Sequence, residues 1–433
     1  MAYRGTSPFS RLRRSSGFVA LFFAALGLPI QAQGQPAGRP AEWPGLWGPG
    51  RDARVAGPFQ VAPGTQVKEL WRRPVGKGFS EVAMAGGRGY VTFSDGEVDH
   101  LAALDLATGK EVWRSRMDPT YRGHDGSDDG PISTPVLAGG RIFSLNPFGK
   151  LFAFDEASGR GLWSRDLKAE LGASPPFWGF ATTPLPVGDT LVVQAGGEQG
   201  NSLVALDPAT GKTLWSSRPA SQSGYSSPVL LTLGGAAQIV AATTDKVFGV
   251  KPEDGTVLWS VASPGEPRQS PVPLPGDRLL LVTWQDATVY KLAREEGAWK
   301  VQELWRKPVL KSTYSPAVYY EGNVYGMNGT YLVCLDPDSG EVRWREKVYN
   351  ASLLLVGGHL ALVGERSGNF HLVEATPEGF REKLKARVFN PGARSLTGPE
   401  FVGGRFLLRN VEEMVMFELT DGAPAPAEGK KGS

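Results

Sequence analysis

The chain has very little cysteine: Cys334 is the single thiol among 433 residues. One thiol excludes an internal disulfide and a cysteine-based metal cluster. Charge of either sign is also not in excess, with 46 Lys plus Arg against 44 Asp plus Glu, which disfavours a nucleic-acid or anionic-membrane partner. Glycine-rich phosphate loops, nucleophile elbows and zinc signatures are absent from the sequence, so the common catalytic motifs give no support for an enzyme.

Long apolar stretches at helical spacing are missing after the first 30 positions. Turn-forming residues are plentiful instead, with 56 Gly and 34 Pro, and the chain carries 12 Trp. Many turns and many large apolar side chains together favour many short strands around a sizeable core. The composition therefore predicts an all-β protein.

The first 32 residues are typical of a secretory signal peptide. A basic region precedes an apolar stretch at 17–30, and Ala32 offers a small-residue cleavage site. The basic residues are Arg4, Arg11, Arg13 and Arg14. Fourteen apolar residues are few for a membrane span, so an uncleaved anchor is the weaker interpretation, and residues 1–32 hold no cysteine for a lipid anchor. Removing four arginines leaves 42 basic against 44 acidic residues. We expect an exported protein, periplasmic or extracellular, with no span after cleavage.

A repeat emerges when segments that end in tryptophan are aligned. Five close copies cover residues 103–113 (ALDLATGKEVW), 153–163, 205–215, 249–259 and 334–344 (CLDPDSGEVRW). Looser copies end at Trp71 and Trp305, and successive tryptophans are 39 to 52 residues apart. A period of this length made of short strands indicates a propeller blade of four strands.

The residues inside the repeat have structural explanations. The turn glycine supplies a positive φ, and the preceding aspartate can accept hydrogen bonds from the turn's amides. We interpret the repeated indole as a docking group that packs on the neighbouring blade. These residues are Trp71, Trp113, Trp163, Trp215, Trp259, Trp305 and Trp344. Cys334 aligns with Ala103 and Ala205, so it fills a slot for a small apolar residue.

Counting inner strands predicts eight four-stranded antiparallel blades. The seventh blade lacks its tryptophan, and the eighth, at 401–419, stops after three strands. The segment 67–75 holds a tryptophan strand with no blade before it, so it should close the last blade and remove the free edges. We expect a linker or N-terminal extension at 33–64, the propeller at 65–420, a disordered tail at 421–433, and a monomer.

The pattern A-x-D-x-x-T-G-x-x-x-W resembles the tryptophan-docking repeat of the pyrroloquinoline-quinone (PQQ)-like propellers. That group includes the quinoprotein alcohol dehydrogenases and the outer-membrane assembly factor of the BamB type. The resemblance covers about residues 65–420, and residues 41–55 (AEWPGLWGPGRDARV) look like the start of exported proteins with such repeats. It implies the fold, and it implies a non-catalytic scaffold that binds a protein or peptide in the cell envelope.

The alternative that the resemblance implies is a PQQ-dependent oxidoreductase with Ca²⁺. Enzymes of that branch place a disulfide between adjacent cysteines against the quinone, and one cysteine cannot form it. We therefore expect no cofactor, while the quinoprotein stays open as the second hypothesis. A carbohydrate- or small-ligand-binding module of the envelope is the third.

One loop has a partial calcium motif. Asp125, Ser127 and Asp129 match the first half of a Ca²⁺ loop, but Val136 stands where the bidentate acid is required. We expect weak Ca²⁺ binding or none, and the simpler interpretation is a solvated connector.

The loops that lead from each outer strand to the next inner strand should surround one mouth of the central channel. They carry aromatic, cationic and amide side chains that turn geometry does not require, and the aromatic and arginine side chains are of the types enriched in binding hot spots. We predict a partner site at these residues, the alternative being that the aromatics only plug the channel. They are Phe177, Trp178, Phe180, Tyr225, Arg268, Lys311, Tyr314, Asn350 and Arg394.

Overall fold

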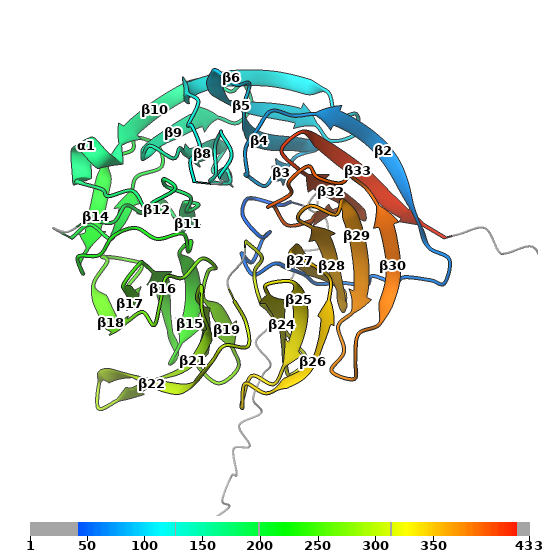
Figure 1. The fold of residues 1–433 in the computed structure, drawn as a ribbon. Coiled ribbons are helices and arrows are strands. Elements are labelled where there is room, and N and C mark those ends of the chain that lie inside the picture. Colours follow the sequence, from blue (N-terminus) through cyan, green and yellow to red (C-terminus); the bar gives the residue numbers. More distant parts are fainter. Residues whose placement is uncertain (1–41, 126, 198–199, 312–313, 422–433) are drawn as a thin grey trace, which may run out of the picture. The chain divides into compact units, whose positions relative to one another are not determined.

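The computed structural model describes residues 42–125, 127–197, 200–311 and 314–421. The chain divides into two units, Met1–Ala37, which lies outside the described residues, and Gly38–Ser433, which contains all of them. The second unit is a β-propeller of eight antiparallel blades, as the sequence predicted, with the blades following one another around a ring (Figure 1). The described residues include one helix, α1 Leu167–Leu171, and no helix there is long and apolar enough to cross a membrane.

Each blade consists of four strands, which follow one another from the channel outwards. Blades 1 and 2 contain β3 Ala83–Ala85, β4 Arg88–Ser94, β5 Val98–Asp105, β6 Glu111–Pro119, and β7 Val136–Ala138, β8 Arg141–Leu145, β9 Lys150–Asp155, β10 Gly161–Asp166. Blades 3 and 4 contain β11 Leu185–Val187, β12 Thr190–Gln194, β13 Leu203–Leu206, β14 Thr213–Ser217, and β15 Val229–Leu233, β16 Ala236–Ala242, β17 Lys246–Val250, β18 Val257–Ala262. Blades 5 and 6 contain β19 Val272–Leu274, β20 Arg278–Val282, β21 Ala287–Glu295, β22 Ala298–Lys307, and β23 Val318–Tyr320, β24 Asn323–Asn328, β25 Tyr331–Leu335, β26 Val342–Lys347. Blades 7 and 8 contain β27 Ala351–Val356, β28 His359–Gly364, β29 Asn369–Glu374, β30 Glu382–Arg387, and β31 Glu400–Val402, β32 Arg405–Arg409, β33 Glu413–Thr420, β2 Gln66–Pro74. The short strand β1 Arg54–Val55 pairs in parallel with β27.

The N-terminal strand closes the ring. Strand β2 pairs antiparallel with β33, in a register that runs from Gln66 opposite Thr420 to Pro74 opposite Glu413. Figure 1 shows the two strands, one blue and one red, side by side although they come from opposite ends of the chain. The predicted closure is confirmed, and the pairing removes the free edge that an open array would leave.

The repeated indole packs on the next blade. A bulge just before each docking tryptophan sets its register, and in five blades the indole stands opposite a small residue, as in the pairs Ala103–Trp113 and Cys334–Trp344. Trp71 and Trp305 stand opposite Met416 and Val289. Trp71 lies so close to the following turn that a Cβ on Gly109 would be 2.8 Å from the indole, and Gly109 also has a φ of +70°. The Trp71 Nε1–H donates to the carbonyl of Leu106 in that turn at 2.8 Å. Glycine is therefore required there for the turn and for the contact.

The thiol of Cys334 is fully buried in its slot. Burial raises the pKa of this thiol to about 11. A neutral, inaccessible thiol behaves as a small apolar group, which agrees with the position of Cys334 in the repeat.

Hydroxyl groups link neighbouring blades near the channel. The Ser133 hydroxyl donates to the carbonyl of Thr182 at 2.9 Å, and the Ser270 hydroxyl donates to the carbonyl of Ser227 at 2.8 Å. The Ser227 hydroxyl in turn accepts from the backbone N–H of Thr183 at 2.9 Å. These side chains satisfy buried backbone groups that the short inner strands leave unpaired.

Residues 42–55 form an N-terminal segment that packs against the inner ends of several blades. Trp43 is fully buried and exchanges two backbone hydrogen bonds with Met84 of blade 1. The Arg51 guanidinium donates to the carbonyl of Thr183 in blade 3 at 3.0 Å, and β1 joins blade 7. The N-terminal segment therefore connects blades on different sides of the channel, and part of the extension expected at 33–64 is an integral layer of the propeller.

Two buried carboxyl groups lie beneath the N-terminal segment. Glu81 Oε2 accepts the backbone N–H of Trp47 at 2.8 Å. Burial raises the pKa of Glu81 to about 7, against the opposing effect of the hydrogen bond from Trp47, and burial also raises the pKa of the neighbouring Glu400. The guanidinium of Arg409 is fully buried near Glu400. Because both carboxyls are withdrawn from water, their neutral forms are favoured in the folded chain.

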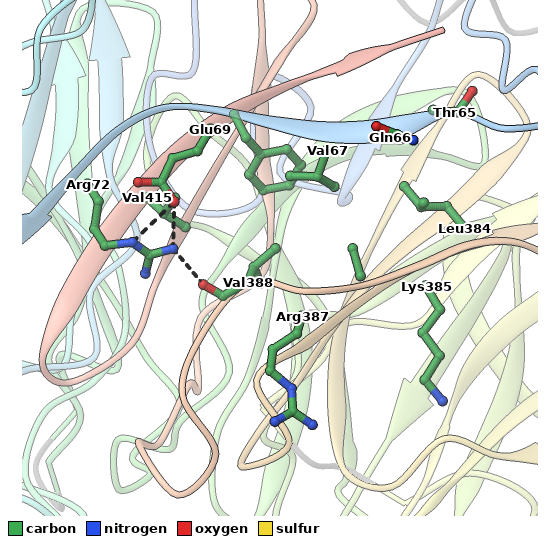
Figure 2. A pocket seen from close by; sticks show the side chains of 12 residues that line it. Thr65, Gln66, Val67, Glu69, Arg72, Leu384, Lys385, Arg387, Val388 and Val415 are labelled. Carbon is green, nitrogen blue, oxygen red and sulfur yellow. Dashed lines mark hydrogen bonds and ion pairs between the residues drawn. The ribbon is translucent and has the colours of Figure 1, made fainter. Parts of the chain in front are cut away.

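The seam between blades 7 and 8 lacks a docking tryptophan, as the sequence predicted. In blade 7, Leu384 on β30 pairs with Leu372 on β29. This is the position that the docking residue Trp344 occupies in blade 6, where it pairs with Cys334. A cavity of about 400 Å³ lies beside Leu384, between β30 and the closing pair β2–β33 (Figure 2). At one end the Arg72 guanidinium donates to the carbonyl of Val388 at 2.8 Å. The interface between blades 7 and 8 is thus incompletely packed.

Filling this seam should stabilise the ring. We expect Leu384→Trp to raise the free energy of unfolding by about 1 kcal/mol, because the larger side chain would fill the cavity with apolar contacts, although no turn is present for it to cover. The matched control, Trp215→Leu in a filled seam, should lower it by about 3 kcal/mol. Denaturant titration monitored by circular dichroism measures both changes. A destabilised Leu384→Trp variant would show that the cavity is not a vacant docking position.

Folding stability should fall as the pH rises through the pKa of Glu81. The folded-state pKa, about 7, lies above the ordinary value of 4.5, so its stabilising contribution is complete below about pH 4.5 and is lost as pH rises through 7. Glu81→Gln keeps an acceptor for Trp47 but does not titrate. The melting temperature of the variant should therefore fall by several degrees less than that of the wild type between pH 5 and pH 8. Parallel curves for the two proteins would contradict the assignment.

Candidate functional site

A central cavity of about 330 Å³ lies on the channel axis. Most of its lining comes from the segments that lead into the inner strands of successive blades, and the N-terminal segment contributes Trp47. Lining residues from six different blades are Phe79, Thr134, Ala181, Ser227, Arg268 and Leu396. Equivalent positions in these blades face the same space because the blades repeat around one axis, so the loops that lead into these blades border the channel.

An arginine within an aromatic cluster dominates one side of the cavity. The Arg268 Cζ lies 4.0 Å from the ring centroid of Trp284, 4.8 Å from that of Trp178 and 5.7 Å from that of Tyr225. The Arg268 side chain is 10% exposed. Among the described residues, its only ion pair is a long contact of 3.4 Å with Glu266. Stacking on aromatic faces stabilises a guanidinium, more so when water is excluded.

Trp178 is fixed by its neighbours. Its backbone N–H donates to the phenol oxygen of Tyr225 at 2.8 Å, and the two rings are 5.7 Å apart. Burial raises the pKa of the Tyr225 phenol to about 12, so the phenol stays neutral. Phe177 makes an edge contact with Trp178 and with His124, and its side chain is 63% exposed. The cluster therefore presents apolar surface to solvent at the mouth.

A second arginine is held by carboxylates. Arg394 lines the cavity, and its Nε donates to Glu365 at 2.9 Å while Nη1 lies 3.6 Å from Asp128. These carboxylates, Glu365 foremost, raise the pKa of Arg394 against the effect of its burial. Tyr314 also lines the cavity and is 46% exposed. Arg394 thus belongs to an ion-pair network, unlike Arg268.

Four predicted residues are not among those that line the cavity. Phe177 lies just outside the lining, in contact with Trp178. Phe180 is fully buried in a core cluster against Gly149 and does not line the cavity, so it belongs to the core and not to the mouth. Lys311 is paired through its backbone with the end of β24 and is not among the lining residues. The Asn350 side chain donates to Glu365 at 3.0 Å, outside the cavity lining.

Sequence reasoning missed Trp284, Trp47 and Glu81, which all line the cavity. Trp284 sits in the hairpin between β20 and β21 and is 55% exposed. A bulky indole in a hairpin, outside the docking slot, was a usable signal. Trp47 lies in a segment with no repeat, and Glu81 lies in a strand-like context, so neither had a pattern to mark it.

The three residues of the partial calcium motif do not converge. The Asp129 carboxylate accepts from Arg122 at 3.0 Å and from the backbone N–H of Gly123 at 3.0 Å. The Ser127 hydroxyl bonds to the backbone of His124, and the Asp125 side chain is 71% exposed. Within the described residues no group of three or more His, Cys, Asp or Glu side chains is arranged to hold a metal. The three side chains therefore contact neighbouring protein groups or solvent and do not point toward a shared cation position.

The cavity residues do not fit a quinone with Ca²⁺. The carboxyl groups that line the cavity are Glu81, which is bonded to the N-terminal segment, and Asp125, which is exposed. Calcium requires six to eight converging oxygens, and these two do not provide them. Cys334 is buried within blade 6, so no thiol reaches the cavity.

Known proteins resemble this chain in sequence. The outer membrane protein assembly factor BamB of Burkholderia pseudomallei is 28% identical over 191 residues, which are 44% of this chain and 45% of that protein. The match thus spans less than half of that relative's length. BamB of Bordetella pertussis is 24% identical over 365 residues, covering 79% of this chain and 84% of that protein.

Solved structures share the fold. BamB from Moraxella catarrhalis has a TM-score of 0.60 at 14% identity, covering 82% of this chain and all of that chain. A quinohemoprotein alcohol dehydrogenase from Pseudomonas putida has a TM-score of 0.58 at 14% identity, covering 83% and 78%. Such likeness shows the fold alone. The family model described as outer membrane protein assembly factor BamB matches residues 95–272 and 239–355, which together are more than half of the chain, and the chain therefore belongs to that family.

Proposed function

We propose that this protein is an exported, non-catalytic scaffold that binds a protein or peptide partner in the cell envelope at the channel mouth. The observation that carries the proposal is the cluster of Arg268 with Trp178, Tyr225 and Trp284 beside an open cavity. Aromatic and arginine side chains bury large areas at low entropic cost, and they dominate the energetics of protein interfaces.

Family membership supports the same function. The relatives are named as outer membrane assembly factors, a role that depends on contacts with other proteins. Residues 1–32 have the pattern of a signal peptide without a lipid-attachment cysteine, which supports export to the periplasm or the exterior. We infer a monomer in the absence of its partner.

The quinoprotein alternative is supported by the shared fold and by a short sequence match, over 22% of this chain, to a probable quinate dehydrogenase (quinone) of Xanthomonas campestris. The chain lacks the cysteine pair, and the cavity lacks a calcium ligand set among the described residues. The third hypothesis, a carbohydrate-binding module, is favoured only by the exposed aromatic rings, which stack on sugars as readily as on peptides.

Partner capture should depend on the cluster. We expect Trp178→Ala combined with Arg268→Ala to reduce capture from a detergent extract of the native envelope at least tenfold, because both hot-spot side chains are lost. The melting temperature should stay within a few degrees of the wild type. Affinity purification with quantitative mass spectrometry measures capture.

A matched control pair exists on blade 6, away from the cavity. Arg345 stacks on Tyr331, with its Cζ 5.4 Å from the ring centroid. Tyr331→Ala with Arg345→Ala removes the same kinds of side chain and should leave capture unchanged. If both double variants capture the partner equally well, the site lies elsewhere. If the Trp178 variant unfolds, that tryptophan is part of the core.

The purified protein should not become a dehydrogenase when PQQ and Ca²⁺ are added. We expect this because the described lining of the cavity contains neither a pair of thiols nor carboxylates that converge on one point, so it offers no ligand set for the cofactor and its Ca²⁺. A dye-linked assay with alcohols and sugars, read against a blank that contains the cofactor but no protein, tests this. Turnover above the blank, with a visible absorption band retained after gel filtration, would establish the quinoprotein alternative instead.

A further inference from the structure

The guanidinium of Arg268 is deeply buried, but few protein groups neutralise its charge or accept its N–H hydrogens. The side chain is nine-tenths buried, and its Nε–H has no hydrogen-bond partner among the described residues. The contact of Nη2 with Glu266, at 3.4 Å, is at the outer limit of a hydrogen bond. Withdrawing a cation from water without a well-placed anion is costly. The three aromatic rings offset part of that cost through the guanidinium faces, but they do not bind the N–H groups along its edge.

The other charged groups around the cavity are already engaged or exposed. Arg394 is bonded to Glu365, and Glu81 holds the N-terminal segment through Trp47. Asp125 lies at the exposed rim. Arg268 is thus an incompletely paired cation in the described lining, and the Glu266 carboxylate at 3.4 Å already offsets part of its charge and would repel a doubly charged anion. This balance matches a ligand that carries a single negative charge.

We propose that Arg268 binds a carboxylate of the partner, and that Trp178 and Trp284 pack against the apolar group next to it. The planar guanidinium offers parallel N–H donors whose spacing fits the two carboxylate oxygens. The carboxylate is either the end of a polypeptide chain or the side chain of an aspartate or glutamate. This assignment rests on the proposed function, because it names the chemical group that the scaffold recognises.

Small probes test the assignment on the full-length protein. 3-Phenylpropionate carries a carboxylate beside an aromatic ring, and 3-phenylpropionamide has the same shape without the charge. We expect the acid to bind at least tenfold more tightly than the amide in calorimetry and in ligand-detected NMR. Arg268→Gln should weaken the acid at least tenfold and leave the amide nearly unchanged, while Arg268→Lys should lie between the two. The control Arg345→Gln should change neither. Equal binding of acid and amide, or full binding by folded Arg268→Gln, overturns the proposal.

Peptide pairs distinguish the two sources of the carboxylate. Acetyl-Gly-Leu-Leu with a free or an amidated C-terminus tests a chain end, and acetyl-Leu-Glu-Leu amide with its glutamine counterpart tests a side chain. A preference of at least fivefold for the anionic member of either pair, lost in Arg268→Gln, identifies the source. A preference in neither pair overturns the proposal.

The experiments distinguish a failure of the carboxylate assignment from a failure of the proposed function. If the Trp178 and Arg268 double variant loses partner capture but the acid probes do not bind, the carboxylate assignment fails and the scaffold function stands. If the acid probes bind at Arg268 but capture is unaffected by the double variant, the partner site at the mouth fails instead.

Discussion

The packing of one indole on the turn of the next blade is the interaction on which this molecule depends. A single blade exposes both faces of its sheet and cannot bury enough apolar area alone. In most blades the docking tryptophan covers the turn of the next one, as Trp71 covers Gly109 and donates to a carbonyl in the same turn. Each contact needs the following blade, so the series is satisfied only by a closed ring. Closure through β2 and β33 is the consequence.

Closure also determines where the interaction weakens. The last blade is assembled from the two ends of the chain, so no continuous hairpin turn joins β33 to β2. A docking tryptophan in blade 7 would have no such turn to cover, and Leu384 stands in its place beside a cavity. The polar contacts of Arg409 with the carbonyls of Ser80 and Thr92, at 2.8 and 2.9 Å, connect blade 8 to blade 1 on the other side. The missing tryptophan is thus explained by topology.

The rigid ring brings together side chains that lie far apart in the sequence. Trp178 precedes blade 3, Tyr225 precedes blade 4, and Arg268 with Trp284 belongs to blade 5. Their inner strands are held in place by the docking contacts outside and by the hydroxyl links inside, so the cluster is preformed. An assembly factor and a quinohemoprotein dehydrogenase share this fold at nearly equal TM-scores, 0.60 and 0.58. The propeller fold therefore does not by itself decide function.

The sequence alone determined the number of blades, the docking tryptophans, the role of Cys334 and the closing strand. These features all follow from one repeat, whose tryptophans are 39 to 52 residues apart, so each copy supports the interpretation of the others. Position near the mouth was also predictable for Trp178 and Arg268, since their loops follow from the repeat. Only the tertiary structure decided that Phe180 is core and that Trp284 stacks on Arg268. The same holds for the N-terminal segment and the acids beneath it, because these contacts join separate blades and depend on distances across the channel that no local pattern encodes.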